Sequence, residues 1–296
     1  MKSPLSREDL WIHRWTKALR LARAPGLRHG IGHDCAVLAA PARKSDLVLK
    51  TDAVVEGVHF LRSTPASLVG RKALARALSD LAAAGATPRA ALITAGCPDK
   101  QSAARLHSIY QGLSRAARIW DVAVVGGETV RTRQLLLSVT LLGTVPRGQS
   151  PHRAGARPGH LLFVTGSLGG SWPRRHLTFT PRLQEGQWLA RKKIPSAMMD
   201  LSDGLGADLP RLARMSNIGF QIHPAKLPFA PGATARQALS RGEDYELLFS
   251  VPTAKAVWLL ENWPFSTRLT QIGRCLPARS GFDSGGFALQ GYDHFR

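Results

Sequence analysis

Residues 65–85 read PASLVGRKALARALSDLAAAG, a run rich in alanine and leucine that carries only four charged side chains. Thr64 before it is suited to cap a helix N-terminus, Pro65 suits a first turn, and Gly85 is typical of the position just past a helix end. The run therefore predicts a helix over residues 65–84.

Strand and helix signals follow one another on both sides of this helix. Residues 46–51 (DLVLKT) and 90–95 are typical of strands. A second helix is expected over about 100–119, then a short strand at 122–125 and a longer one at 135–144. These elements make the first half of the chain α+β.

The composition changes at residues 146–159, PRGQSPHRAGARPG, which are rich in Pro, Gly and Arg. A chain of 296 residues is near the practical limit of a single core, so two domains are expected. We place their boundary in this stretch, which predicts domains at 1–147 and 148–296.

The second half repeats the mixture of strands and helices, without an internal sequence repeat. The strand HLLFVTG (160–166) opens it and a polar loop region follows. Further elements are the strand AMMDL (197–201), a helix near 206–216 and a last strand, ELLFSV (246–251). The expected fold is α+β in two domains.

Composition limits the classes of function. The three cysteines, Cys35, Cys97 and Cys275, form no CxxC pair, which argues against a disulfide framework and favours the cytoplasm. We expect no signal peptide and no membrane span, because the charges are scattered through the first twenty residues and the apolar runs are short. The net charge of +20 attracts polyanions, but without a nucleic-acid-binding motif we expect only non-specific nucleic-acid binding.

The acidic residues are few, and half of the twenty lie in short motifs beside apolar or small residues. Such positions, at the ends of expected strands and helices, let a rigid scaffold aim carboxylates at one place. Converging carboxylates are suited to a hard cation such as Mg²⁺, which usually couples to substrate phosphates. Some of them, Asp80 and Asp203 above all, have helix capping as their alternative role.

Several other motifs are weaker. The chain has no GxxxxGK[ST] sequence, so a P-loop is excluded. The turn GSLGGS (166–171) is suited to phosphate but is unspecific, and FDSGG (282–286) lacks the His and Asp segments of a serine protease. His29 and His33 could lie near each other and bind a transition metal, but such pairs are more often incidental.

Read in order, the motifs resemble those of the thiamine-monophosphate kinase family, within the superfamily of aminoimidazole ribonucleotide synthetase and selenophosphate synthetase. The resemblance covers nearly the whole chain. Its carriers are GIGHDCAVL, TDAVVEGVHF, GRKALARALSDLAAAGATP, VVGGETVRT, RAGARPG, DLSDGL, GEDYELLF and GYDHF.

This resemblance implies an α+β first domain that pairs with a second copy to form a homodimer, and an α+β second domain with the active site in the cleft. It implies transfer of the ATP γ-phosphoryl group to thiamine monophosphate, assisted by several Mg²⁺ ions and without a side-chain general base.

The resemblance also assigns residues, and Asp203 is the most critical of them. The implied metal ligands are Asp34, Thr51, Asp52, Asp80, Glu128, Asp200 and Asp203. The implied ATP contacts are Gly127, Arg153 and Ser202. The positions implied for the thiamine phosphate are His59, Glu243 and Tyr292.

The chain departs from the family pattern at a few of these motifs. His33 stands where a second aspartate is usual, and Lys50 where a small hydroxyl residue is usual. Glu128 replaces an aspartate, and Arg241 precedes GED in place of glycine. A related ATP-using synthetase and a non-catalytic, polyanion-binding descendant of the scaffold are the alternative functions.

Overall fold

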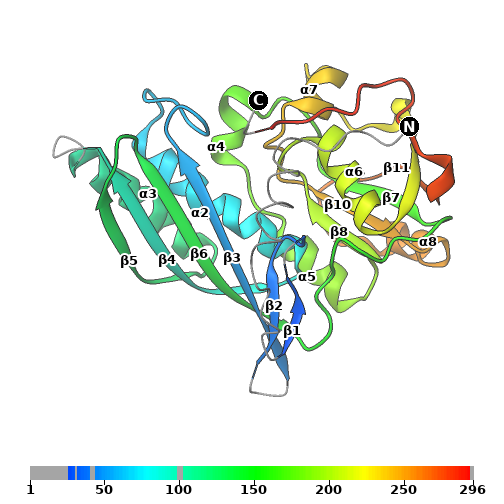
Figure 1. The fold of residues 1–296 in the computed structure, drawn as a ribbon, viewed down its shortest axis with the longest axis horizontal. Helices are drawn as coiled ribbons and strands as arrows, with labels where there is room; N and C mark the ends of the chain where they lie inside the picture. The colour runs from blue at the N-terminus through cyan, green and yellow to red at the C-terminus, as the bar shows by residue number, and fades with distance from the viewer. Residues whose placement is uncertain (1–25, 31, 41–43, 99–102, 294–296) are drawn as a thin grey trace.

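The computed structural model describes residues 26–30, 32–40, 44–98 and 103–293. Two six-stranded sheets, each packed against helices, lie side by side (Figure 1). The expected α+β architecture in two halves is confirmed. The last strand of the first sheet ends at Pro146, and the first strand of the second sheet begins at Leu161. The domain limits 1–147 and 148–296 stay a prediction.

The first sheet has the strand order β1-β2-β3-β6-β4-β5, in which β4 and β5 are parallel and the other neighbours antiparallel. Its strands are β1 (Leu27–His29), β2 (Ala36–Ala39), β3 (Ser45–Val55), β4 (Thr87–Cys97), β5 (Ala123–Arg131) and β6 (Leu136–Pro146). Helices α2 (Ala66–Ala83) and α3 (Ala103–Ile119) cover one face.

The second sheet has the order β12-β9-β11-β7-β10-β8, in which only β12 and β9 are parallel. Its strands are β7 (Leu161–Thr165), β8 (Ala197–Asp200), β9 (Ile218–Ile222), β10 (Leu247–Val251), β11 (Leu269–Pro277) and β12 (Phe282–Asp283). The helices of this half are α4 (His176–Thr178), α5 (Leu183–Arg191), α6 (Leu205–Met215), α7 (Ala235–Ser240) and α8 (Thr253–Asn262).

Helix α2 lies between the two halves and is buried along most of its length. One side packs on the first sheet and on α3, and the other on α5 and β8. Small residues permit this contact, since a Cβ on Gly186 of α5 would lie 2.0 Å from the carbonyl oxygen of Ala82. The core is continuous, because Leu81 belongs to the same buried cluster as Met198 and Phe249. The alanine-rich sequence of α2 thus brings the two halves together.

Most of the expected elements are present, usually with longer bounds, but three expectations were wrong. The start of the helix expected at about 100 lies partly outside the described residues. Thr64 does not cap α2, because Pro65 occupies the N-cap and the Thr64 hydroxyl accepts a hydrogen bond from the Leu61 amide (3.1 Å). The expected polar loop region contains α5, and β10 is not the last strand, since α8 and β11 follow it. None of the helices in the described part of the chain has the length and apolarity that a bilayer crossing requires.

Candidate active site

A pocket lined mainly by charged side chains lies where α2 meets the second half of the chain. It encloses about 250 Å³. We call it the acidic pocket. Its lining residues are Lys50, Asp52, Arg76, Asp80, Arg153, Asp200, Ser202, Asp203, Arg211 and Tyr245.

Three buried carboxylates come together at this pocket, from segments far apart in the sequence. Asp34 follows β1, Asp80 lies in α2 and Asp200 ends β8, and one carboxylate oxygen from each residue lies within 4.8 Å of the other two. Among the described residues, no other group of three or more His, Cys, Asp or Glu side chains lies close enough together to hold a metal ion. Burial and the charge of Asp34 raise the pKa of Asp200 to about 6, and burial raises the pKa of Asp80 well above its ordinary value. Carboxylates crowded in this way favour a cation between them.

Basic side chains already pair with two of these carboxylates. Lys50 Nζ lies 2.7 Å from Asp80 Oδ1. Arg153 holds Asp34 with two parallel hydrogen bonds, from Nε (3.0 Å) and Nη2 (2.9 Å). Asp200 accepts a hydrogen bond from the Ser79 hydroxyl (2.7 Å). Arg153 therefore lies beside this group of three carboxylates, next to Asp34.

The other two predicted aspartates of the acidic pocket are also paired. Arg76 Nε donates to Asp52 Oδ2 at 3.1 Å, and Arg211 Nη1 donates to Asp203. Of the seven predicted metal ligands, five thus line the acidic pocket or its carboxylate group: Asp34, Asp52, Asp80, Asp200 and Asp203.

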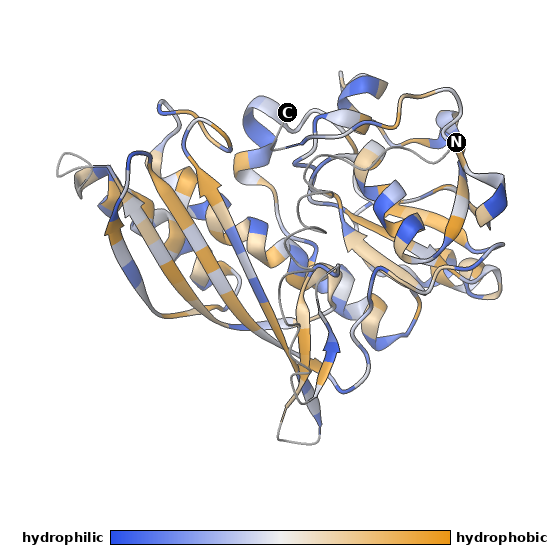
Figure 2. Ribbon diagram, viewed as in Figure 1, coloured by the Kyte–Doolittle hydropathy of each residue, from blue (hydrophilic) through white to orange (hydrophobic). Residues whose placement is uncertain are grey.

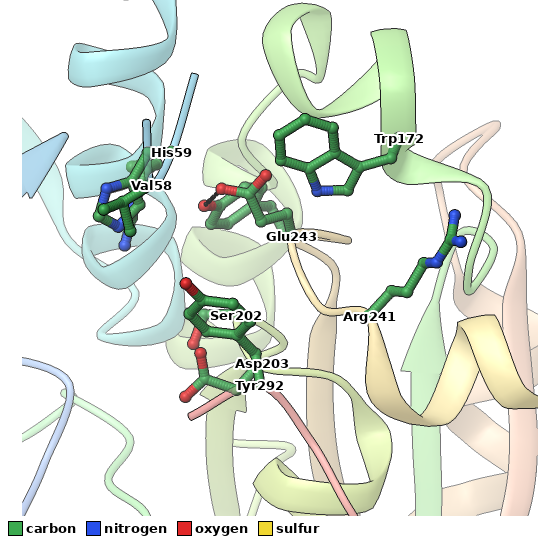
Figure 3. A pocket seen from close by; sticks show the side chains of 10 residues that line it. Val58, His59, Trp172, Ser202, Asp203, Arg241, Glu243 and Tyr292 are labelled. Carbon is green, nitrogen blue, oxygen red and sulfur yellow. Dashed lines mark hydrogen bonds between the residues drawn. The ribbon is translucent and has the colours of Figure 1, made fainter. Parts of the chain in front are cut away.

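A second pocket adjoins the acidic pocket, and we call it the tryptophan pocket. Figure 3 shows its side chains, with His59 and Val58 on one side, Trp172 and Arg241 on the other, and Glu243 between them. The predicted thiamine phosphate positions His59, Glu243 and Tyr292 are brought together here. The lining residues are Val58, His59, Arg76, Trp172, Ser202, Asp203, Arg241, Glu243, Tyr245 and Tyr292.

A buried lysine fixes Glu243 in this pocket. The Lys72 ammonium donates to both oxygens of Glu243, at 2.7 and 2.9 Å, and lies 5.6 Å from the centre of the Trp172 ring. Burial lowers the pKa of Lys72 to about 8, although Glu243 opposes the change. Burial acts to raise the pKa of Glu243, but a hydrogen bond from His176 and the charge of Lys72 lower it to about 2. Glu243 therefore presents a fixed negative charge at neutral pH.

Three predicted residues do not point into either pocket. Thr51 lies on the face of the first sheet opposite α2, where its hydroxyl contacts Thr140 and Ser138 at 3.1 and 3.4 Å. Glu128 lies on the exposed strand β5, and its side chain accepts a hydrogen bond from the amide of Thr129. Gly127 pairs with Ile93 in the same strand ladder. Strand β5 lies three strands from β3, so Gly127 and Glu128 are roughly 14 Å from Asp52.

The histidines predicted as an incidental pair do lie together. The His29 and His33 ring centres are 5.1 Å apart, and the His152 ring joins them at 4.9 and 5.6 Å. Burial lowers the pKa of all three, that of His29 to about 4, with help from its histidine neighbours. His33 accepts a hydrogen bond from the Arg153 amide (3.4 Å), so it supports the chain beside Asp34.

The glycine-rich turn GSLGGS (166–171) also has a structural role. The amide of Gly169 and the hydroxyl of Ser171 donate to the Asp244 carboxylate, which Arg175 also contacts at 2.7 Å. The turn was considered as a phosphate site. Its donors instead bind the Asp244 side chain, which belongs to the same half of the protein.

The sequence and fold of the chain match known proteins. The family described as AIR synthase related protein, N-terminal domain, matches residues 32–145. Thiamine-monophosphate kinase of Rhodopirellula baltica is 35% identical over 274 residues, which cover 86% of this chain and 85% of the relative. The chain belongs to the thiamine-monophosphate kinase family.

Other members of the thiamine-monophosphate kinase family are similar over most of their length. The Escherichia coli K12 member is 37% identical over 252 residues, covering 75% of this chain and 76% of the relative. A solved structure, AaThiL complexed with AMPPCP and TMP, has a TM-score of 0.83 at 31% identity. The structural match covers 98% of this chain and 97% of that chain.

Sequence reasoning missed several lining residues that this member of the thiamine-monophosphate kinase family places in its pockets. Arg76, which lines both pockets, and Lys72, which holds Glu243, lie four and eight residues before the predicted Asp80 on one face of α2, and that spacing could have found them. Trp172 and Tyr245 carry no such signal, because the short helical turn Ser171–Arg175 and the segment just before β10 bring them to the site.

Proposed function

We propose that this chain transfers the γ-phosphoryl group of ATP to the phosphate of thiamine monophosphate, giving thiamine diphosphate. The observation that carries the proposal is the pair of adjoining pockets. The acidic pocket suits a nucleotide and its cations, and the tryptophan pocket offers an indole and the anion of Glu243 to an aromatic cation such as thiamine. Four residues line both pockets, so the two substrates would meet there.

Relatives support this reaction. Members of the family that are 35% and 37% identical carry the name thiamine-monophosphate kinase, and the chain spans most of their length. AaThiL, which has the same fold over 98% of this chain, is complexed with AMPPCP, an ATP analogue, and TMP. The same residue positions are therefore expected to bind the two substrates here.

The chemistry needs little from side chains beyond position and charge. The attacking atom is an oxygen of a phosphate monoester that is largely ionised at neutral pH, so no general base is required. Catalysis then depends on holding the two phosphates in line and on compensating their negative charges. The cationic side chains around the two pockets, Arg76 and Arg153 among them, would contribute to both tasks.

Magnesium fits the donor set, because the three buried carboxylates that come together here are hard oxygen ligands. We propose that Asp34, Asp80 and Asp200 would hold it, with Asp52 and Asp203 facing the same pocket. When bound, Mg²⁺ supplies charge neutralisation and orientation to the phosphates. Arg153, Ser202 and Gly127 stay proposed nucleotide contacts, although Gly127 lies on β5, the edge strand of the first sheet that is three strands from β3.

A homodimer is part of the proposal. The face of the first sheet opposite α2 exposes Leu49 (38%) and Leu92 (48%), and Figure 2 shows apolar residues spread over that sheet. In the described part of the chain no helix covers this face, and such a surface is typical of a protein interface. Thr51 and Glu128 belong to the same face, so a ligand role for them requires a site completed there by a second copy. The three cysteines of the chain form no CxxC pair, which fits a reducing cytoplasm.

The test is turnover of ATP, Mg²⁺ and thiamine monophosphate, followed as thiamine diphosphate formed. We expect product with the wild type, none after chelation of divalent cations, and recovery with added Mg²⁺. Asp203→Asn should abolish turnover while the fold is retained, whereas Asp283→Asn, on the edge strand β12, should not affect it. Nucleotide hydrolysis with another acceptor would favour a related synthetase, and binding of polyanions without turnover would favour the non-catalytic alternative.

A further inference from the structure

We propose that Arg76 is a catalytic residue of this phosphoryl transfer, contacting the transferred group as it passes between the two pockets. The inference deepens the proposed function and rests on it. Arg76 matches no motif residue assigned by the family resemblance, and its case rests on position, on an unpaired donor and on charge.

The position of Arg76 places it at the boundary between the pockets. Four residues line both of them: Arg76, Ser202, Asp203 and Tyr245. Arg76 is the one cation among these four. A phosphoryl group that moves from a nucleotide in the acidic pocket to an acceptor in the tryptophan pocket must cross the space that these residues share.

The guanidinium of Arg76 has a donor to spare at that boundary. Its Nε is held by Asp52 at 3.1 Å, and Asp52 is itself fixed by the amide of Ala53 at 2.8 Å. The Nη1 atom is buried and has no hydrogen-bond partner. A buried donor without an acceptor is unfavourable, and a bound phosphate oxygen would satisfy it.

The neighbouring cations are directed at other partners. Lys50 contacts Asp80, Arg153 grips Asp34 with two hydrogen bonds, and Lys72 donates to Glu243. Other buried polar atoms that lack a partner in the described chain belong to Arg105, Arg175 and Thr270, none of which lines either pocket. Within these two pockets, Arg76 is thus the cation with a buried donor left over.

The environment keeps Arg76 charged and rigid. An arginine guanidinium stays protonated at neutral pH, and the carboxylates of Asp52 and Asp203 line the acidic pocket with it. Tyr245 is buried and stacks on Phe179 at 4.1 Å between ring centres, which makes a firm wall beside the guanidinium. A planar guanidinium matches phosphate oxygens in geometry as well as charge.

The reaction step assigns a specific task to this group. The bond between the γ-phosphorus and the bridging oxygen breaks, and its electron pair stays on the oxygen that becomes the terminal oxygen of ADP. An unprotonated oxygen of the acceptor phosphate supplies the pair for the new bond to that phosphorus, so no proton moves. Negative charge is spread over the three remaining oxygens of the group in transit, and Arg76 Nη1 donates to one of them.

The matched experiment compares Arg76→Met with Arg71→Met. Both residues are arginines of α2, and both changes remove one positive charge, but Arg71 contacts the Leu177 carbonyl (3.3 Å) and the Trp120 ring outside the pockets. We expect Arg76→Met to lower kcat by roughly 100-fold or more, since arginines at a transferring phosphoryl group contribute on the order of 10³. Arg71→Met should retain wild-type kcat.

A binding measurement separates a catalytic contact from a structural one. Calorimetry with AMPPCP and, separately, with thiamine monophosphate reports the ground state. ADP with aluminium fluoride and thiamine monophosphate imitates the group in transit. Arg76→Met should weaken the aluminium fluoride complex by a factor similar to the loss in kcat, and should change ground-state binding by less than about 10-fold.

The outcomes are distinct. An equal loss of AMPPCP affinity and kcat, or near wild-type kcat in Arg76→Met, overturns the assignment while the proposed function stands. A wild type that makes no thiamine diphosphate overturns the proposed function, and this inference with it. If Arg76→Met does not fold by circular dichroism, Arg76→Lys keeps the charge beside Asp52 but loses the planar fork, and a kcat loss below about threefold would overturn the assignment.

Discussion

Asp200→Asn is expected to stabilise the metal-free protein at pH 8 while weakening its response to Mg²⁺. Asp200 is buried at the end of β8, 3% exposed, and shares the carboxylate group with Asp34 and Asp80. The substitution keeps the shape of the side chain, and the amide oxygen can still accept the hydrogen bond from Ser79. It removes a negative charge that the fold holds against burial and like-charge repulsion.

The size of the effect follows from the pKa of Asp200, which burial and Asp34 raise from 3.8 to about 6. Below pH 3.8 the carboxyl group is neutral in both the folded and the unfolded chain, so it behaves like an amide. Between pH 3.8 and 6 the unfolded chain loses this proton first, and the folded state becomes less stable as pH rises. Above pH 6 the full difference, about 3 kcal/mol, opposes folding.

Urea unfolding in EDTA at pH 8 and at pH 4 measures the free energy of unfolding for both proteins. Asp200→Asn should exceed the wild type by about 3 kcal/mol at pH 8, and the difference should nearly vanish at pH 4. Added Mg²⁺ should raise the stability of the wild type more than that of the variant, because a ligand is lost. Glu261→Gln, on the exposed end of α8, is the control and should show neither change.

An Asp200→Asn protein that is less stable than the wild type at pH 8 in EDTA would refute this prediction. A gain of the same size at pH 4 would also refute it, because the effect would then not arise from ionisation of this carboxyl group.

Three further predictions concern the cations, the open sheet face and the surface charge. Lys50→Met should bind one more Mn²⁺ than the wild type by electron paramagnetic resonance, while Lys44→Met, an exposed lysine, should not; equal numbers would contradict this. Leu92→Asp should convert a dimer to a monomer by light scattering, and a wild-type monomer would rule out the interface. Duplex DNA binding should fall steeply and linearly in log salt, whereas binding of ATP·Mg²⁺ with thiamine monophosphate should persist; salt-resistant duplex binding without substrate binding would contradict the kinase.

The sequence was most informative where local and tertiary preferences agree. Helix α2 is alanine-rich and long, and the strands around it alternate in burial, so their types were predicted correctly. Asp200 and Asp203 were predicted to converge with Asp34 because short acidic motifs ended apolar runs, and the described structure brings them to one region. His59, Glu243 and Tyr292 likewise meet in one pocket, although their roles stay a prediction.

Elements fixed by tertiary pairing could not be found in the same way. Strand β5 extends to Arg131 through a glycine pair that disfavours strands, because pairing with β4 overrides local preference. This extension carries Glu128 onto the open sheet face, away from the carboxylates it was grouped with. Helix α5 is short and has a glycine at its centre, where the close contact with α2 needs one.

One departure from the family motifs, Lys50, has a clear consequence in the acidic pocket. Four carboxylates and four basic side chains line the acidic pocket, so their formal charges cancel. Asp34, which accepts hydrogen bonds from Arg153, adds one further negative charge. The formal charge is therefore close to neutral before any divalent cation binds. A cation coordinated by the Asp80 oxygen that Lys50 contacts at 2.7 Å would lie within about 5 Å of the ammonium, where the two repel. Lys50 thus occupies the space, and supplies the positive charge, that a metal ion would otherwise bring to Asp80. Its removal should therefore add a metal-binding site.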